Sequence, residues 1–156
     1  MTGHLVFSTI HTNDAPSAAT RLINLGVPPY LLSSTLSLVV AQRLLRRVCQ
    51  ECREAYEPLP AIRERFGLKA ELLYKAKGCS QCSNTGYRGR LGVYEVMGIT
   101  RQLRDLVAKG EPAHALRETA VHHAGMNSLW DAGLAKVEGG LTSLEELESV
   151  VLLSLG

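Results

Sequence analysis

Four cysteines are the residues of this 156-residue chain whose spacing points most directly to chemistry. They form two Cys-x-x-Cys pairs, Cys49 with Cys52 and Cys79 with Cys82, separated by 26 residues. Each pair can present two thiolates from one tight turn, and two such turns complete a tetrahedral four-sulfur site for zinc. Four protein ligands leave no open position for water or substrate. The spacing therefore predicts a structural zinc site.

Other uses of the cysteines remain open. The separation between the pairs exceeds that of common zinc ribbons, which favours a helical insertion between them. A redox dithiol needs only one pair, and neither pair has the strand-to-helix setting of a thioredoxin-like site. Redox-active or unliganded thiols are the alternatives to zinc.

Two histidines, His4 and His11, flank a short apolar run near the start of the chain. The run at 5–10 has strand character and leads into a polar loop. Asp14 then predicts the start of a helix that ends near Gly26. The apolar pattern from Pro28 predicts a longer helix that reaches about Val48. One strand and two helices are too few for a complete α/β domain.

The remainder of the chain reads as mainly helical around one strand. The expected elements are short helices within 61–75, a strand at 90–97, helices at 101–108 after Thr100, at 112–125 and at 127–137, and a last helix behind a Thr142–Glu145 capping box.

Composition excludes several classes of protein. The net charge is only +2 and aromatic residues make up 5% of the chain, which argues against a nucleic-acid-binding surface. Polar residues interrupt the richest apolar stretch, 31–48, so it does not predict a membrane span. No signal peptide is evident, and we expect a cytoplasmic protein.

Several stretches resemble one bacterial family, the ATPases that power type II secretion and type IV pilus assembly. The opening resembles the histidine box of these enzymes, and the paired cysteines point to their extension or secretion branch. The matching stretches are TGHLVFSTIHTNDAP, RLINLGVPPYLL, AQRLLRRVCQEC, GCSQCSNTGYRGRLGVYEVM, LRETAVHHAGM and GLTSLEELESVV.

The resemblance implies an α/β fold: the C-terminal part of a RecA-like ATPase domain, followed by a mainly helical region with a four-cysteine zinc site. It implies three segments: 1–48 from the ATPase core, 49–98 with the zinc site and a return strand, and 99–156 as a helical C-terminal region. It also implies a homo-hexamer that is cytoplasmic and peripherally associated with the inner membrane through a platform protein.

The motifs that bind and cleave ATP are not in this sequence. It contains no G-x-x-x-x-G-K-[S/T] loop to hold phosphates. It also lacks the acidic strand end that would hold Mg²⁺. We therefore expect a fragment that uses ATP and Mg²⁺ only within a longer parent and does not hydrolyse ATP alone.

Strand geometry gives the two histidines of this box different expected roles. An extended run between them spans about 23 Å, so they cannot contact the same phosphate. Ligands of parallel α/β sheets gather at the carboxyl ends of strands, where His11 lies. We expect His11 to sense the γ-phosphate, assisted by Thr12 and Asn13, with a loop-capping role as the alternative. His4 is expected to have a structural or subunit-contact role.

Three further residues are weaker candidates for nucleotide or subunit contacts. Arg21 could reach a phosphate or a neighbouring subunit, but a solvated helix face is equally consistent with the pattern. Gln42 and Arg43 resemble the AQRL segment of the family. Cationic residues that complement a helix C-terminus are the alternative reading of this segment.

Two other functions compete with the ATPase fragment. The chain could be an autonomous zinc-stabilised protein-interaction module. A zinc module for nucleic acid is weaker, because basic residues are few and aromatic residues are not interleaved with them.

Overall fold

The computed structural model describes residues 3–152, and these residues form two compact units. Unit 1 combines the residues up to Ala41 with Val96–Met126, and unit 2 combines Gln42–Glu95 with the residues from Asn127 onward. Each unit is therefore built from two separate stretches of the chain. The predicted boundaries at 48/49 and 98/99 divide the sequence into consecutive segments and stay a prediction.

Unit 1 is built from four helices that contact one another. Helix α1 contacts α2 and α5, and α4 also contacts α2 and α5. Alanines at positions 15, 18 and 19 are buried on α1, and their small side chains allow close helix packing. The helices are α1 (Ala15–Asn24), α2 (Pro29–Thr35), α4 (Arg101–Lys109) and α5 (Ala113–Ala124).

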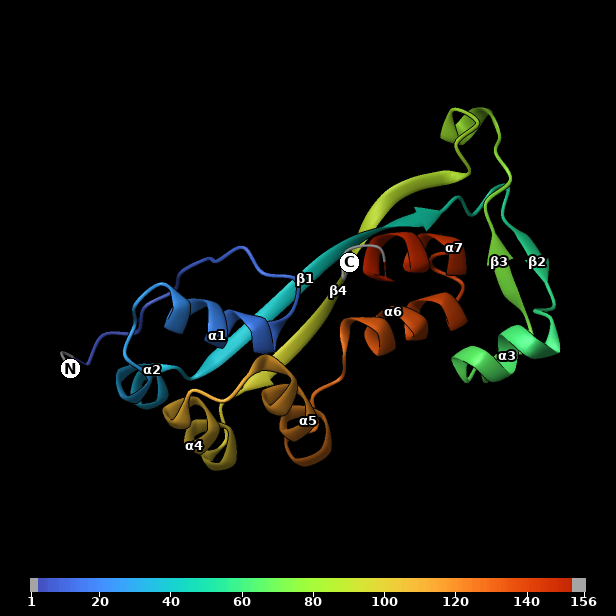
Figure 1. Ribbon diagram of the computed structural model, residues 1–156. Helices are drawn as coiled ribbons and strands as arrows, with labels where there is room; N and C mark the ends of the chain where they lie inside the picture. The colour runs from blue at the N-terminus through green and yellow to red at the C-terminus, as the bar shows by residue number, and fades with distance from the viewer. Residues whose placement is uncertain (1–2, 153–156) are drawn as a thin grey trace. The chain divides into compact units, whose positions relative to one another are not determined.

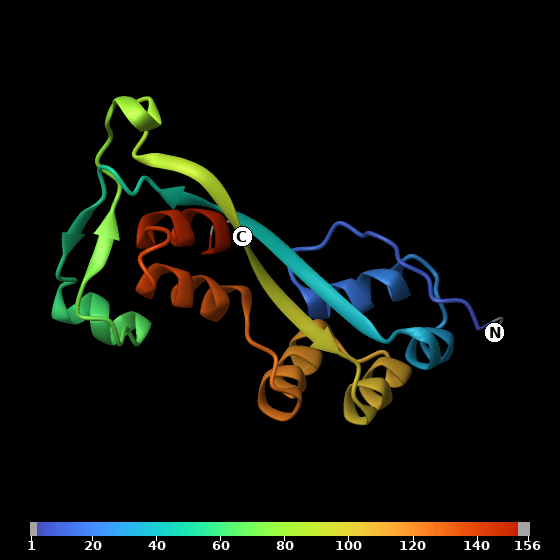
Figure 2. The ribbon, with the colours of Figure 1, turned by 180° about the vertical axis from the view of Figure 1, so that it is seen from behind.

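Two long strands, β1 (Leu38–Val48) and β4 (Tyr87–Gly98), pair with each other and contribute residues to both units. The amide of Ile99 donates to the carbonyl of Ser37 (3.0 Å), and the amide of Cys49 donates to the carbonyl of Gly86 (2.9 Å). Since the two bonds join opposite ends of the strands, the pair is antiparallel, as the arrows in Figures 1 and 2 show.

Unit 2 adds a small antiparallel strand pair and several short helices. Glu54 pairs with Lys75 and Tyr56 with Leu73 in the small sheet. Helices α6 and α7 contact each other. The elements are β2 (Glu54–Tyr56), α3 (Pro60–Phe66), β3 (Leu73–Lys75), the 3₁₀ turn η1 (Ser80–Cys82), α6 (Leu129–Glu138), α7 (Leu144–Leu147) and the π-helical turn η2 (Glu148–Leu152).

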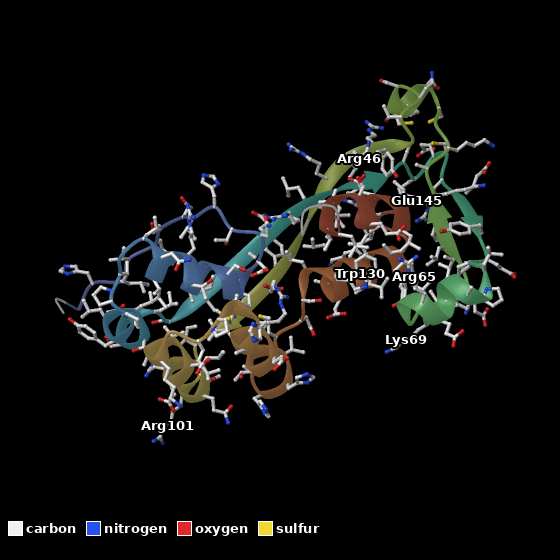
Figure 3. All side chains as sticks on the ribbon, in the orientation of Figure 1. Arg46, Arg65, Lys69, Arg101, Trp130 and Glu145 are labelled. Atoms are coloured by element: carbon white, nitrogen blue, oxygen red, sulfur yellow. The ribbon has the colours of Figure 1, made fainter. Side chains whose placement is uncertain are left out.

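A network around Arg46 attaches α7 to β1. Both Nε and Nη2 of Arg46 donate to Oε2 of Glu146, at 2.8 and 2.5 Å, and the Arg46 amide donates to Oε1 at 2.9 Å. The guanidinium lies 4.2 Å from the centre of the Tyr87 ring. Thr142 donates to the Arg46 carbonyl. Figure 3 labels Arg46 on its strand close to α7. The network therefore joins residues from both stretches of unit 2.

Glu95 is a second buried carboxylate, with 1% of the residue exposed. Its Oε2 accepts a hydrogen bond from the amide of Leu129, the first residue of α6 (3.3 Å). A carboxylate at a helix N-terminus satisfies an otherwise unpaired N–H group and complements the helix dipole. Glu95 thus fixes the start of α6 on β4.

The prediction of one helix from Pro28 to Val48 is wrong, because α2 ends at Thr35 and β1 follows. Hydroxyls of Ser33, Ser34 and Thr35 donate to carbonyls three or four residues earlier, which weakens continuation of the helix. The residues of β1 include good helix formers, but pairing with β4 overrides that local preference.

The strand expected at 5–10 is also not formed: residues 3–12 have no regular secondary structure. Leu5, Val6 and Phe7 are 77–87% exposed. A strand requires a neighbouring ladder, and within residues 3–152 the sheets comprise β1 with β4 and β2 with β3. The sequence pattern is that of a strand, but the described chain provides no strand beside it.

Most of the later elements are confirmed. β4 contains the strand expected at 90–97, Thr100 caps α4, and α5 and α6 match the expected helices within two residues at either end. The helical expectation at 61–75 holds only for α3. The Thr142–Glu145 capping box is wrong: Ser143 caps α7, because Thr142 instead bonds the Arg46 carbonyl. No helix among the described residues is long and apolar enough to cross a membrane.

Candidate functional site

The four cysteines come together as the sequence predicts. Their Sγ atoms all lie within 4.8 Å of one another. Three of the Sγ–Sγ distances are 3.9 Å (Cys49–Cys79), 3.8 Å (Cys52–Cys82) and 3.8 Å (Cys79–Cys82). Four sulfurs placed about 2.3 Å from a tetrahedral zinc would be about 3.8 Å apart. These separations exceed the S–S bond length of about 2.05 Å, so the cysteines are free thiols with zinc-site spacing.

Two tight turns present the sulfurs. In the first turn, which follows β1, the Cys52 amide donates to the Cys49 carbonyl (3.3 Å). The second turn contains η1, and the Asn84 amide donates to the Cys79 carbonyl (2.9 Å). Ser83 and Asn84 adopt positive φ values of 51° and 58°. This left-handed backbone turns the chain sharply after the second pair and leads it into β4.

Backbone amides also face the sulfurs. Gly78 donates to Cys52 Sγ (3.3 Å), while Cys79 and Gly86 each donate to Cys82 Sγ (3.2 Å). Burial alone would raise the pKa of Cys82, but hydrogen bonds from the two amides and from the thiols of Cys79 and Cys52 outweigh it, and its pKa falls to about 6. Burial dominates at Cys52, where it raises the pKa to about 12 against the opposing amide of Gly78.

The donor set fits zinc. Amide-to-sulfur bonds stabilise thiolates, the form in which cysteine binds a metal. Because zinc binds cysteine as thiolate, metal binding would release the protons that remain on the cluster. With four protein sulfurs the coordination is closed, and the arrangement suits a structural ion.

The residues expected near nucleotide on the first segment lie in unit 1. His11 and Asn13 are exposed in the loop before α1, and Arg21 is exposed on α1. Thr12 is half-buried, and its hydroxyl donates to the carbonyl of Asp14 (3.1 Å). The loop is thus attached to the start of α1, while its histidine side chain faces outward. A nucleotide role for these residues stays a prediction.

The other candidates are distributed differently. Gln42 and Arg43 belong to unit 2, where Gln42 Nε2 donates to the Tyr94 hydroxyl (3.2 Å) and Arg43 Nη1 donates to the Gln42 carbonyl (3.1 Å). They lie on a strand rather than at the end of a helix, which removes the helix-dipole alternative for Arg43. His4 is exposed in the segment that precedes the loop. Nucleotide or subunit contacts of these residues also stay predictions.

One interaction beside the histidine loop was missed by sequence reasoning. Arg117 Nη2 on α5 lies 2.6 Å from Asp14 Oδ2, while Asp14 Oδ1 accepts from the Ser17 amide (2.8 Å). The cap is a local pattern that the sequence reveals. The ion pair depends on tertiary packing of α5 against α1, and the only signal for it is an arginine beside the buried Leu116.

Comparisons with known proteins agree with the motifs. A family model described as "Type II/IV secretion system protein" matches residues 1–149. The type IV pilus assembly ATPase PilB of Myxococcus xanthus is 41% identical over 94% of this chain and 27% of its own length. PilB of Thermus thermophilus is 42% identical over 94% of the chain and 17% of its length. The type II secretion system ATPase E of Vibrio cholerae is 42% identical over 96% of the chain and 30% of its length. The chain thus spans less than a third of these relatives.

Proposed function

Since the chain belongs to the Type II/IV secretion system protein family, we propose that it is the C-terminal, zinc-binding part of a hexameric ATPase that powers type IV pilus assembly or type II secretion. One observation carries the proposal: the family match spans residues 1–149 and includes four cysteines whose sulfurs have the spacing of a zinc site.

Unit 1 supplies the nucleotide-facing part in this proposal. Its histidine loop belongs to the C-terminal part of a RecA-like domain, and His11 senses the γ-phosphate of an ATP held by other parts of the longer protein. Thr12, Asn13 and Arg21 assist at this phosphate or at a subunit boundary. The exposure of His11 and Arg21 supports this role, because a group that meets a separate ligand must be accessible.

Unit 2 supplies the metal-stabilised part. Zinc cross-links the turn after β1 to the turn before β4 through Cys49, Cys52, Cys79 and Cys82. Because the small strand pair of β2 and β3 is marginal by itself, a metal cross-link at its base would contribute directly to folding. Gln42 and Arg43 are proposed to contact nucleotide or an adjacent subunit.

The longer protein acts at the inner membrane in this proposal. It is cytoplasmic, associates with the membrane peripherally through a platform protein, and uses ATP with Mg²⁺. The present chain alone does not hydrolyse ATP, because it contains neither a phosphate-binding loop nor an acidic residue to hold Mg²⁺ in the positions that the mechanism requires.

ATP turnover tests the nucleotide role. We expect the longer protein to hydrolyse ATP and the 156-residue chain to be inactive. His11→Ala should lower turnover in the longer protein by about 100-fold, within the range for removal of a group that contacts the reacting phosphate, and His4→Ala by less than about threefold. A larger loss for His4→Ala would refute the assignment. A longer protein that binds partners without turning over ATP would favour the interaction module.

Metal analysis tests the zinc site independently. The chain purified without chelator should contain one zinc ion, and Cys79→Ser should lower that content. Ser80→Ala is the matched control, because Ser80 is exposed in the same turn and provides no sulfur ligand. Zinc far below one ion per chain in the unsubstituted protein would contradict a structural metal.

A further inference from the structure

We propose that Arg117 is a positioning residue for the histidine loop, His11–Asn13, and acts on it through Asp14. This inference rests on the proposed nucleotide role of His11. It adds a residue from α5, far along the chain, to the groups that set the direction of the loop.

Asp14 is the junction through which Arg117 acts. One carboxylate oxygen, Oδ1, accepts from the Ser17 amide (2.8 Å) and fixes the first turn of α1. The other, Oδ2, meets Arg117 Nη2 (2.6 Å). The backbone carbonyl accepts from the Thr12 hydroxyl (3.1 Å). One residue thus joins the helix, the ion pair and the loop.

The Asp14 carboxylate is largely buried, so its orientation depends on its ion pair with Arg117. The side chain of Asp14 is 11% exposed and that of Arg117 is 37% exposed, so the carboxylate has little access to water. An unpaired carboxylate there would have to rotate toward solvent, which would break its bond to Ser17. Loss of the bond to Ser17 would in turn release the backbone of Asp14, whose carbonyl accepts from the Thr12 hydroxyl. Loss of the Arg117 cation should therefore loosen the loop together with the first turn of α1, while the rest of α1 stays packed against α5.

The helices on either side are packed closely enough to transmit a displacement. Ala15 and Ala19 of α1 and Leu116 and Ala120 of α5 are all 0% exposed, and the two helices are in contact. Close-packed side chains do not absorb small shifts, so a movement of α5 along α1 must carry Arg117 with it. The ion pair would then redirect the loop that presents His11.

Four substitutions separate charge, cap and control. Asp14→Asn removes the charge but keeps a good N-cap side chain. Arg117→Gln removes the cation with similar length, and Arg117→Lys restores it for the single Oδ2 contact. Arg104→Gln on α4 removes an exposed arginine from the same unit and is the control.

The first readout is kinetic, in the longer ATPase. We expect Arg117→Gln and Asp14→Asn each to lower kcat about tenfold with KM for ATP changed less than about twofold, because a misplaced group loses transition-state contacts. Arg117→Lys should recover at least half the activity, and Arg104→Gln should be unchanged. In a His11→Ala background, Arg117→Gln should have less than about a twofold further effect, since both act through one loop. Equal effects in the two backgrounds would overturn the proposal.

The second readout does not depend on catalysis. In the 156-residue chain, the backbone NMR order parameters of Thr12 and Asn13 should fall from about 0.85 to below about 0.6 in Arg117→Gln, and those of α1 beyond its first turn, from Ala19 onward, should not change. Unchanged loop order in both Arg117→Gln and Asp14→Asn would refute positioning even if His11 proves essential. A loosened loop in a longer protein that lacks ATPase activity would instead refute the proposed function and leave positioning intact.

Discussion

Substitution of Arg46 should destabilise unit 2 more than substitution of its partner Glu146. The reason is unequal burial: the Glu146 side chain is 4% exposed, whereas that of Arg46 is 56% exposed. Arg46→Met removes both guanidinium bonds and the stacking on Tyr87. It leaves the buried Glu146 carboxylate with the hydrogen bond from the backbone amide of residue 46 (2.9 Å). Glu146→Gln leaves a guanidinium that water can reach.

The expected losses in the free energy of unfolding follow from this difference in burial. Breaking a fully buried ion pair costs about 3–5 kcal/mol, and partial access of water on the Arg46 side should reduce this to about 2–3 kcal/mol for Arg46→Met. Glu146→Gln keeps an oxygen that can accept from the Arg46 amide, so we expect a cost of about 1 kcal/mol.

Denaturant unfolding of zinc-saturated protein would measure these costs. Trp130 is the only tryptophan of the chain and lies in unit 2, where its ring centre is 5.1 Å from that of Phe66. Its fluorescence therefore reports unfolding of the unit that holds the network. Arg47→Met, at the next and exposed position, should change stability by less than about 0.5 kcal/mol. A greater loss for Glu146→Gln than for Arg46→Met would refute the reasoning.

Three further substitutions or treatments have defined outcomes. Gly133→Ala should cost about 1–3 kcal/mol in the same assay, because the added Cβ would overlap Leu147, and an unchanged unfolding midpoint would contradict this. Lys77 hydrogen-bonds Glu54 and, with Lys75, lowers the pKa of that carboxyl from 4.5; the resulting stabilisation is complete above pH 4.5 and is lost as the pH falls through the lowered pKa. The unfolding midpoints of the unsubstituted chain and Glu54→Gln should therefore converge in acid, and a constant difference would contradict this. Acid should release zinc as protons compete for the thiolates, measured with a colorimetric chelator, and zinc retained after full acid unfolding would argue against cysteine ligation.

Local features of the sequence predicted local features of the structure. The Asp14 cap, the helices near the C-terminus and the two cysteine turns each depend on residues within a few positions of one another. The cysteine pairs also predicted a long-range contact, because metal-ligand spacing constrains which turns must meet. The candidate metal centre could therefore be predicted from the sequence alone.

Features that depend on contacts between residues far apart in the sequence could not be predicted from the sequence. β1 contains helix-forming leucine, arginine and glutamine residues, and only its pairing with β4 makes it a strand. Thr142 was expected to form a capping box with Glu145, but its hydroxyl bonds the Arg46 carbonyl. The Glu146 carboxylate also bonds Arg46, which lies 100 residues earlier. The pairing of Asp14 with Arg117 similarly depends on how α1 packs against α5. No local pattern distinguishes these partners from solvated charges.

The division of each unit into two stretches has a consequence for synthesis and for truncation. Unit 1 cannot be completed until residues 96–126 have been made, and unit 2 requires residues beyond Asn127. All four cysteines leave the ribosome earlier than this, so they can bind metal while both units still lack their second stretch of chain. A cut at any single peptide bond would leave at least one unit incomplete. The two units should therefore be separable only by joining distant segments in a rearranged chain.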